Sequence, residues 1–262
     1  MRQSNGYIIF FTVILTIVVG GILAGASIVL GPAQKKSIEL ETKTQILSAV
    51  RTLVEVKQGD DILAIYKNRI SSTVVDYNGN EVTKDEKGNK IMAENVDVLK
   101  NYKKKPEDRI YPVFKLRSSA DTSKIEAYVL PVYGNGLWDK IWGYVAIGSD
   151  LETIVGASFD HKAETPGLGQ RIATQEIQDR FVGKKIVDEK GQIVSVEMTK
   201  GEHGGGQASM DYYKDDPHHV DGMSGATLTG KGLNAMLKQY LQSYKNYFDL
   251  VKRDGKSVAT NQ

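Results

Sequence analysis

The sequence predicts an α+β protein, in which one N-terminal transmembrane helix is followed by an antiparallel-sheet domain with flanking helices. Residues 7–30 carry no charge. Short apolar or alternating runs bounded by Gly, Asp or Asn follow from residue 125, which is typical of strands. Apolar residues recur at helical spacing in 36–57 and again after residue 227. Strands with helices at both ends indicate an α+β domain.

The apolar run 7–30 is long enough to cross a hydrocarbon core about 30 Å thick. A cleaved signal peptide is the alternative, because Ala24-Gly25-Ala26 has the small-x-small cleavage pattern. We expect a retained anchor, since Arg2 is the one charge before a run that exceeds the usual signal-peptide core. The distribution of positive charge does not set the orientation of this helix in the membrane. Arg2 and the amino terminus lie on one side of the apolar run and Lys35 and Lys36 on the other, so the two sides carry similar positive charge.

The amino-acid composition argues against nucleic-acid binding and against several kinds of metal site. The chain has 34 Lys and Arg against 32 Asp and Glu, interspersed along the sequence, which does not favour nucleic-acid binding. It contains no Cys, which excludes disulfides, thiolate metal sites and iron–sulfur ligation. The adjacent His218 and His219 do not share a face, and His-Glu-x-x-His is absent, so we expect no metal site.

The remaining elements follow from local patterns. An amphipathic helix is expected over 36–57 and a second helix through Ile62, Leu63 and Tyr66. Residues 77–110 are polar and turn-rich, which indicates a hairpin and loop region. Strands are expected over 125–133, 141–147, 154–159 and 193–198, a short helix over 174–181, a flexible loop at 204–206, and a long helix whose apolar face runs from Leu233 to Phe248. The predicted organisation is an anchor over 1–34, a helical and polar-loop part over 35–123, the main domain over 124–250 and a C-terminal tail over 251–262.

Residues 221–227 read Asp-Gly-Met-Ser-Gly-Ala-Thr and run directly into the predicted long helix. This places a hydroxyl where a Gly-containing turn opens into a helix. Free backbone N–H groups and the positive end of the helix dipole favour an anion such as phosphate there. The alternative is a plain helix cap, for which Asp221, Ser224 and Thr227 are all suitable.

Ser224-Gly225-Ala226-Thr227, with Asp221 three residues before the serine, resembles the flavinylation motif of the FMN-binding domain family. This family occurs in the C subunit of sodium-translocating NADH:quinone reductases and in the G subunit of Rnf complexes. In it the threonine carries FMN through a phosphoester bond, which implies covalent FMN on Thr227. The resemblance makes 124–250 the FMN-binding domain.

Two further segments match the same family in the same order. They are Gly136-Leu137-Trp138 and the run 164–169, Glu-Thr-Pro-Gly-Leu-Gly. The resemblance covers the anchor and most of 124–248, whereas 77–110 carries no recognised motif. The cofactor-binding residues that it implies are Asp221, Ser224, Gly225, Ala226, Thr227, Gly136, Leu137, Trp138, Glu164, Thr165, Gly167 and Leu168.

Each segment suits a flat, partly apolar flavin ring. Trp138, Leu137 and Leu168 are suited to cover the ring, and the glycines let the backbone approach it. Thr165 is expected to offer its hydroxyl to the ring edge. The alternative for Gly136-Leu137-Trp138 is a hairpin with a core Trp, and the alternative for Thr-Pro-Gly-Leu-Gly is a plain turn. Glu164 either tunes the flavin or holds its turn.

The resemblance implies a membrane-anchored subunit of a sodium-pumping NADH:quinone oxidoreductase, which relays electrons through covalent FMN to drive Na⁺ export. It implies partner subunits of the A, B, D, E and F types, and a flavin transferase that uses FAD and magnesium. Asp221 would assist recognition by that enzyme or cap the helix. The location implied is the bacterial inner membrane, single-pass, with the soluble domain in the periplasm. We expect no catalytic residue during turnover. The alternatives are the G subunit of an Rnf complex and a non-redox anchored binding domain.

Overall fold

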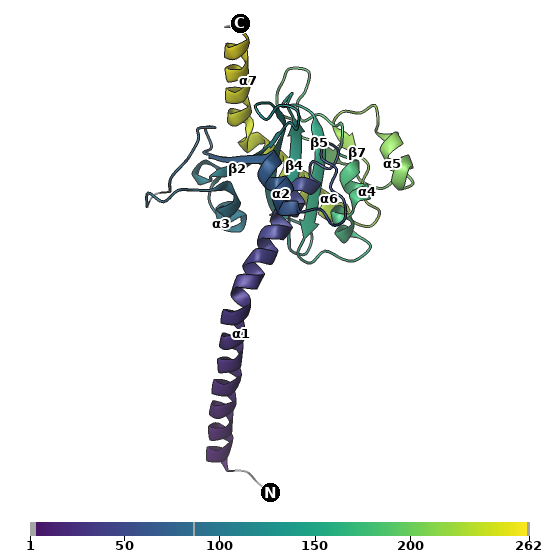
Figure 1. The fold of residues 1–262 in the computed structure, drawn as a ribbon. Helices are drawn as coiled ribbons and strands as arrows, with labels where there is room; N and C mark the ends of the chain where they lie inside the picture. The colour runs from purple at the N-terminus through teal and green to yellow at the C-terminus, as the bar shows by residue number, and fades with distance from the viewer. Residues whose placement is uncertain (1–3, 86, 261–262) are drawn as a thin grey trace. The chain divides into compact units, whose positions relative to one another are not determined.

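The structure is a computed structural model that describes residues 4–85 and 87–260, and only the backbone of 254–260 (Figure 1). The chain divides into two compact units, one ending at Lys43 and the other beginning at Thr44. The secondary structure comprises α1 (Asn5–Ser48), α2 (Ile62–Arg69), β1 (Ile70–Val75), η1 (Ala93–Asn95), α3 (Val98–Tyr102), η2 (Pro106–Asp108), β2 (Tyr111–Arg117), β3 (Ile125–Asn135), β4 (Lys140–Gly148), β5 (Ile154–His161), η3 (Gly169–Ala173), α4 (Gln175–Asp179), β6 (Glu197–Met198), α5 (Gly206–Tyr212), β7 (His219–Val220), α6 (Thr227–Ser243) and α7 (Lys245–Thr260).

The first unit is helical. Helix α1 is apolar and long enough to cross a membrane, and its apolar stretch is not buried by the rest of the chain. The prediction of a long apolar N-terminal helix is confirmed.

The predicted helix over 36–57 ends early, at Ser48. From there the chain turns sharply, so that Val50 and Val54 are buried in the second unit. The Thr52 hydroxyl donates to the Val155 carbonyl at 2.5 Å, and an Arg51 guanidinium nitrogen donates to the Ala157 carbonyl at 2.9 Å. These bonds to β5 hold the turn and end the helix, which no local pattern reveals.

The second unit is built on a five-stranded antiparallel sheet in the order β1-β2-β3-β4-β5. Each strand pairs with the next along the chain, so the sheet is a simple meander (Figure 1). The predicted strands over 125–133, 141–147 and 154–159 are confirmed as β3, β4 and β5. Strands β1 and β2 were not predicted. The fold class, an α+β domain on an antiparallel sheet, is confirmed.

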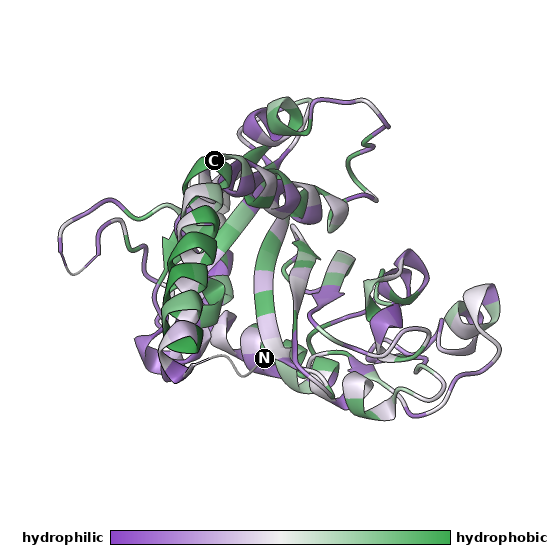
Figure 2. Cartoon of the chain, turned by 90° about the horizontal axis from the view of Figure 1, so that it is seen from below, coloured by the Kyte–Doolittle hydropathy of each residue, from purple (hydrophilic) through white to green (hydrophobic). Residues whose placement is uncertain are grey.

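Both faces of the sheet are covered, because successive strand residues point to opposite sides. Val113, Leu130 and Val132 face a core formed with α6 and α7. Phe114, Leu116 and Val129 face a second core, formed with residues 46–54 and α2. Figure 2 shows hydrophobic and intermediate residues along the strands, whereas hydrophilic residues lie in the loops and on the helices around the sheet. The sheet is therefore the central layer, and both of its faces carry apolar side chains.

The C-terminal half departs from the sequence predictions in three places. The expected strand 193–198 is reduced to Glu197–Met198, which pairs in parallel with β7. The expected loop at 204–206 is in part helical, because α5 begins at Gly206. The apolar face from Leu233 to Phe248 is broken at Tyr244 into α6 and α7.

Tyr244 lies at the helix break, and its hydroxyl donates to the Pro112 carbonyl of β2 at 2.7 Å. The expected helix over 174–181 is confirmed in the shorter α4. Residues 251–260, which lie within the predicted C-terminal tail over 251–262, continue α7.

The polar region 77–110 contains the expected hairpin turns. Asp76 and Asp85 each accept hydrogen bonds from the amides two and four residues further on, at 2.8–2.9 Å. Short bridges join Val75 to Glu81 and Lys84 to Lys90. This is the side-chain-held turn for which aspartate is favoured.

Candidate functional site

Two loops and the first turn of helix α6 meet at one buried carboxylate. The β3–β4 loop carries Gly136, Leu137 and Trp138, and Glu164 belongs to the loop after β5. Glu164 is 4% exposed, and its Oε1 accepts a hydrogen bond from the Trp138 amide at 3.0 Å. Its Oε2 accepts one from the Thr229 hydroxyl of α6 at 2.5 Å. Two segments singled out by sequence are thus joined to the first turn of α6, and Glu164 holds them together.

Two glycines permit this close approach. A Cβ on Gly136 would lie 2.3 Å from Glu164 Oε1, and one on Gly169 would lie 2.4 Å from Thr229 Oγ1. Neither position has room for a side chain while Glu164 keeps its contacts. These glycines therefore let the backbone pack against the carboxylate.

The apolar residues of the site face solvent. Trp138 is 69% exposed, Leu137 44% and Leu168 40%. Trp138 Nε1 donates to Thr165 Oγ1 at 3.1 Å, which leaves the hydroxyl proton of Thr165 free to donate elsewhere. The alternative of a hairpin with a core Trp is wrong, because the indole lies on the surface.

Helix α6 begins at Thr227 without a side-chain cap. Its N-cap residue is Ala226, which has no side-chain oxygen to accept from the first amides of the helix. Within the described residues, the amides of Thr227, Leu228 and Thr229 have no hydrogen-bond acceptor, and the first intrahelical bond runs from the Gly230 amide to Ala226. Neither Ser224 nor Thr227 caps the helix, so the alternative of a plain helix cap is wrong. Three N–H donors lie beside the half-exposed Thr227.

Asp221 does not cap the helix either. Its side chain is fully buried, and it accepts hydrogen bonds from the His203 amide at 2.7 Å and the Ser209 hydroxyl at 2.6 Å. His203 Nδ1 lies 2.8 Å from its other oxygen. Burial opposes ionisation, but the hydrogen bonds from Ser209 and His203 outweigh it and hold the pKa of Asp221 below its usual range. The motif aspartate therefore faces the protein interior.

Glu202 was not singled out by the sequence analysis, yet it touches the same loop. Its Oε2 accepts a hydrogen bond from the Ser224 amide at 3.1 Å. Arg171 binds both oxygens, at 2.6 and 2.8 Å, and Arg180 binds one at 2.7 Å. The hydrogen bond from Arg171 is the largest cause that lowers the pKa of Glu202, to about 2. No sequence motif marks Glu202, because its partners lie 22 or more residues away.

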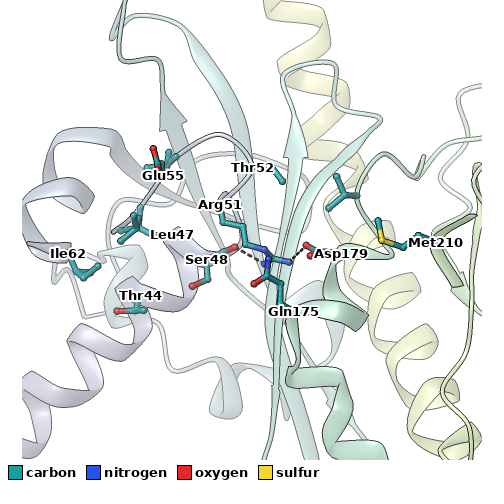
Figure 3. A pocket seen from close by; sticks show the side chains of 13 residues that line it. Thr44, Leu47, Ser48, Arg51, Thr52, Glu55, Ile62, Gln175, Asp179 and Met210 are labelled. Carbon is teal, nitrogen blue, oxygen red and sulfur yellow. Dashed lines mark hydrogen bonds and ion pairs between the residues drawn. The ribbon is translucent and has the colours of Figure 1, made fainter. Parts of the chain in front are cut away.

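A cavity of about 690 Å³ lies elsewhere in the second unit. Its lining includes Leu47, Thr52 and Met210, and Figure 3 shows Arg51 reaching from this wall toward Asp179. None of Trp138, Leu168 or Thr227 lines it. The site that the sequence predicts is therefore a surface formed by loops and the start of α6, and it is separate from this cavity.

The residues present suit FMN. The free amides at the start of α6 are donors for a phosphate, and the hydroxyl of Thr227 is at the same place. The exposed Leu137, Trp138 and Leu168 offer apolar surface of the kind that a flavin ring covers. Fold and site together define the chain as a protein with an FMN-binding domain after an apolar N-terminal helix.

Comparison with known proteins agrees with this class. The FMN-binding domain family matches residues 136–242. The C subunit of the Na(+)-translocating NADH-quinone reductase of Neisseria meningitidis serogroup A is 32% identical over 245 residues, 89% of both chains. The C subunit from Pasteurella multocida is 27% identical over 92% of this chain and 91% of its own. A crystal structure of the C subunit from Parabacteroides distasonis is 31% identical with a TM-score of 0.66, over 83% of this chain and 96% of that one.

The chain belongs to the family of C subunits of the Na(+)-translocating NADH-quinone reductase. This agrees with the resemblance found in the sequence, and it favours this family over the G subunit of an Rnf complex.

Proposed function

We propose that this chain is the membrane-anchored FMN subunit of a sodium-translocating NADH:quinone reductase, and that FMN is attached through its phosphate to Thr227. The observation that carries the proposal is the start of α6, where a hydroxyl stands beside three amides that lack acceptors. Helix capping does not account for Ser224, Thr227 or Asp221, which supports another role for the motif. Attachment of a phosphate at this point uses both the hydroxyl and the amides.

The residues of the chain bind and orient the cofactor. The amides of Thr227, Leu228 and Thr229 stabilise the phosphate charge, and Leu137, Trp138 and Leu168 shield the ring. Glu164 holds the two loops and the first turn of α6 together through its hydrogen bonds with Trp138 and Thr229. FMN, when bound, supplies reversible electron transfer. Thr227 is used once, as the attachment point, and no other side chain needs to act as nucleophile or base during turnover.

The proposal includes a location and partners. Helix α1 anchors the chain in the bacterial inner membrane, and the soluble domain faces the periplasm, where covalent attachment prevents loss of the flavin. A single apolar helix offers no path for Na⁺. The chain therefore works beside multi-span subunits, of the A, B, D, E and F types, and electrons reach it from NADH oxidised by another subunit. A flavin transferase uses FAD as donor: the pyrophosphate bond of FAD breaks, the FMN phosphate is joined to Thr227 Oγ, the hydroxyl proton is lost, and AMP is the leaving group.

The test is covalent labelling. The full chain, expressed with its flavin transferase, is expected to carry flavin fluorescence through a denaturing gel and to gain the mass of one FMN less one water. Thr227→Ala is expected to lose both signals completely, because no oxygen remains to form the phosphoester.

Thr73→Ala is the control, since it removes a threonine hydroxyl in β1, outside the motif, and it is expected to keep both signals. Covalent flavin on Thr227→Ala, or a colourless wild-type chain after coexpression, would contradict the proposal. A chain that stays colourless would support a non-redox binding domain instead.

A further inference from the structure

The loop before α6 is held by side chains from outside it. This segment, residues 221–226, is here called the attachment loop. The Ser224 amide donates to Glu202 at 3.1 Å. Arg180 donates to the carbonyl of Gly222 at 2.6 Å and to that of Asp221 at 3.3 Å. Its side chain is 1% exposed, so these bonds are shielded from water.

The contacts are reciprocal. The loop residue Asp221 accepts from the backbone amide of His203, and the neighbouring Glu202 accepts from the backbone amide of the loop residue Ser224. Two carboxylates thus each bind an amide of the opposite segment, as the two partners of a capping box do within one helix. Because the bonds join two points on each segment, they fix the orientation of the loop as well as its position.

The charges of the arginine and glutamate side chains in this cluster balance. Arg171 and Arg180 both contact Glu202 and Glu176, so two cations face two carboxylates. A lone carboxylate beside the loop would repel a phosphate, whereas a neutralised one does not. The arginines therefore allow Glu202 to bind the Ser224 amide without repelling an anion from the start of α6.

We propose that Glu202 and Asp221 form a reciprocal carboxylate clamp, which holds the attachment loop in the conformation on which the flavin transferase acts. In this arrangement Glu202 is a positioning residue, and it acts through Ser224. The buried side chain of Asp221 holds the other end of the loop, because it accepts hydrogen bonds from His203 and Ser209. The clamp rests on the proposed attachment at Thr227, and it adds a residue outside the family motif.

The test measures flavin transfer and loop order separately. The apo form of the full chain, purified in detergent from cells without the transferase, is mixed with purified transferase, FAD and Mg²⁺. We expect Glu202→Ala to lower kcat/KM for attachment about ten-fold or more, because it removes a charge-assisted network. Glu202→Gln keeps one oxygen for the Ser224 amide and is expected to lie between Glu202→Ala and the wild type.

Hydrogen exchange of the same apo proteins, without transferase, gives the second readout. Glu202→Ala is expected to increase exchange in the peptide that covers 221–226 and to leave the peptides of the β-sheet unchanged. Glu126→Gln is the matched control, since Glu126 is also a partly buried carboxylate paired with an arginine, Arg69, at 2.9 Å. The control is expected to match the wild type in both measurements.

Wild-type attachment rates in both Glu202 variants would overturn the clamp, as would unchanged exchange in the loop. If Glu202→Ala does not fold, Glu202→Gln decides alone, and wild-type behaviour in it overturns the proposal. A wild-type chain that takes no flavin contradicts the proposed function instead. The exchange measurement then still tests whether Glu202 holds the loop.

Discussion

At the scale of single residues, the site depends on Glu164 and on the exposure of Trp138. Glu164 is buried and uses both oxygens within the protein, one for Trp138 and one for Thr229. A buried carboxylate that lost one of these donors would keep an unsatisfied charge, which is costly. Of the two roles open to Glu164, these bonds favour that of holding its turn. Trp138 is free to contact a ligand because its ring is mostly exposed.

The residue-scale prediction concerns Trp138. Trp138→Ala removes an exposed ring, so we expect a change of about 0.5 kcal/mol or less in the free energy of unfolding. Covalent attachment is expected to continue, because the start of α6 is untouched. The fluorescence or redox potential of the flavin is expected to change, since the flavin ring loses its contact with the indole of Trp138. An unchanged spectrum and an unchanged potential would mean that the flavin lies elsewhere.

At the scale of elements, the attachment loop is shaped by one glycine. Gly225 has φ +73°, a left-handed conformation that glycine adopts without strain. A Cβ there would lie 2.8 Å from Leu168 Cδ2. The loop before α6 and the loop after β5 therefore touch at this point, and Leu168 covers the glycine. Gly225 is therefore required for two separate reasons, its left-handed backbone conformation and its close contact with Leu168.

These two demands predict different effects for Gly225→Ala and Gly183→Ala. Gly183 has φ +82° and open space around it. Both substitutions are expected to lower the free energy of unfolding by about 1–2 kcal/mol, the cost of a left-handed L residue. Only Gly225→Ala displaces Leu168, so only this variant is expected to alter flavin attachment or flavin fluorescence. Identical flavin signals in the two variants, measured beside thermal unfolding, would contradict a flavin site at Leu168.

At the scale of the whole molecule, the second unit begins within α1. Ile46, Leu47 and Val50 are at most 1% exposed and belong to the core on one face of the sheet. The other face is covered mainly by α6 and α7. The chain that follows the apolar run is therefore part of the folded domain from Thr44 onward, and it completes one of two cores.

This arrangement predicts where the chain can be shortened. A chain of residues 44–262 is expected to fold and unfold cooperatively, because it keeps both cores. A chain of 55–262 is expected to be much less stable, since each large buried side chain contributes about 1.5–3 kcal/mol. Thermal unfolding followed by circular dichroism compares the two. Equal midpoints would show that residues 44–54 do not stabilise the domain.

The sequence alone determined the fold class, the apolar helix, strands β3 to β5 and the family, because these depend on local periodicity and short motifs. It also marked Thr227 as the attachment residue, which stays a prediction. Only the tertiary structure decided how the motif is held. Glu202 contacts Ser224, Glu164 contacts Thr229, and Asp221 turns inward rather than capping α6. The physical reason is that a hydrogen bond depends on distance in space, and these partners lie between 12 and 65 residues apart in the chain.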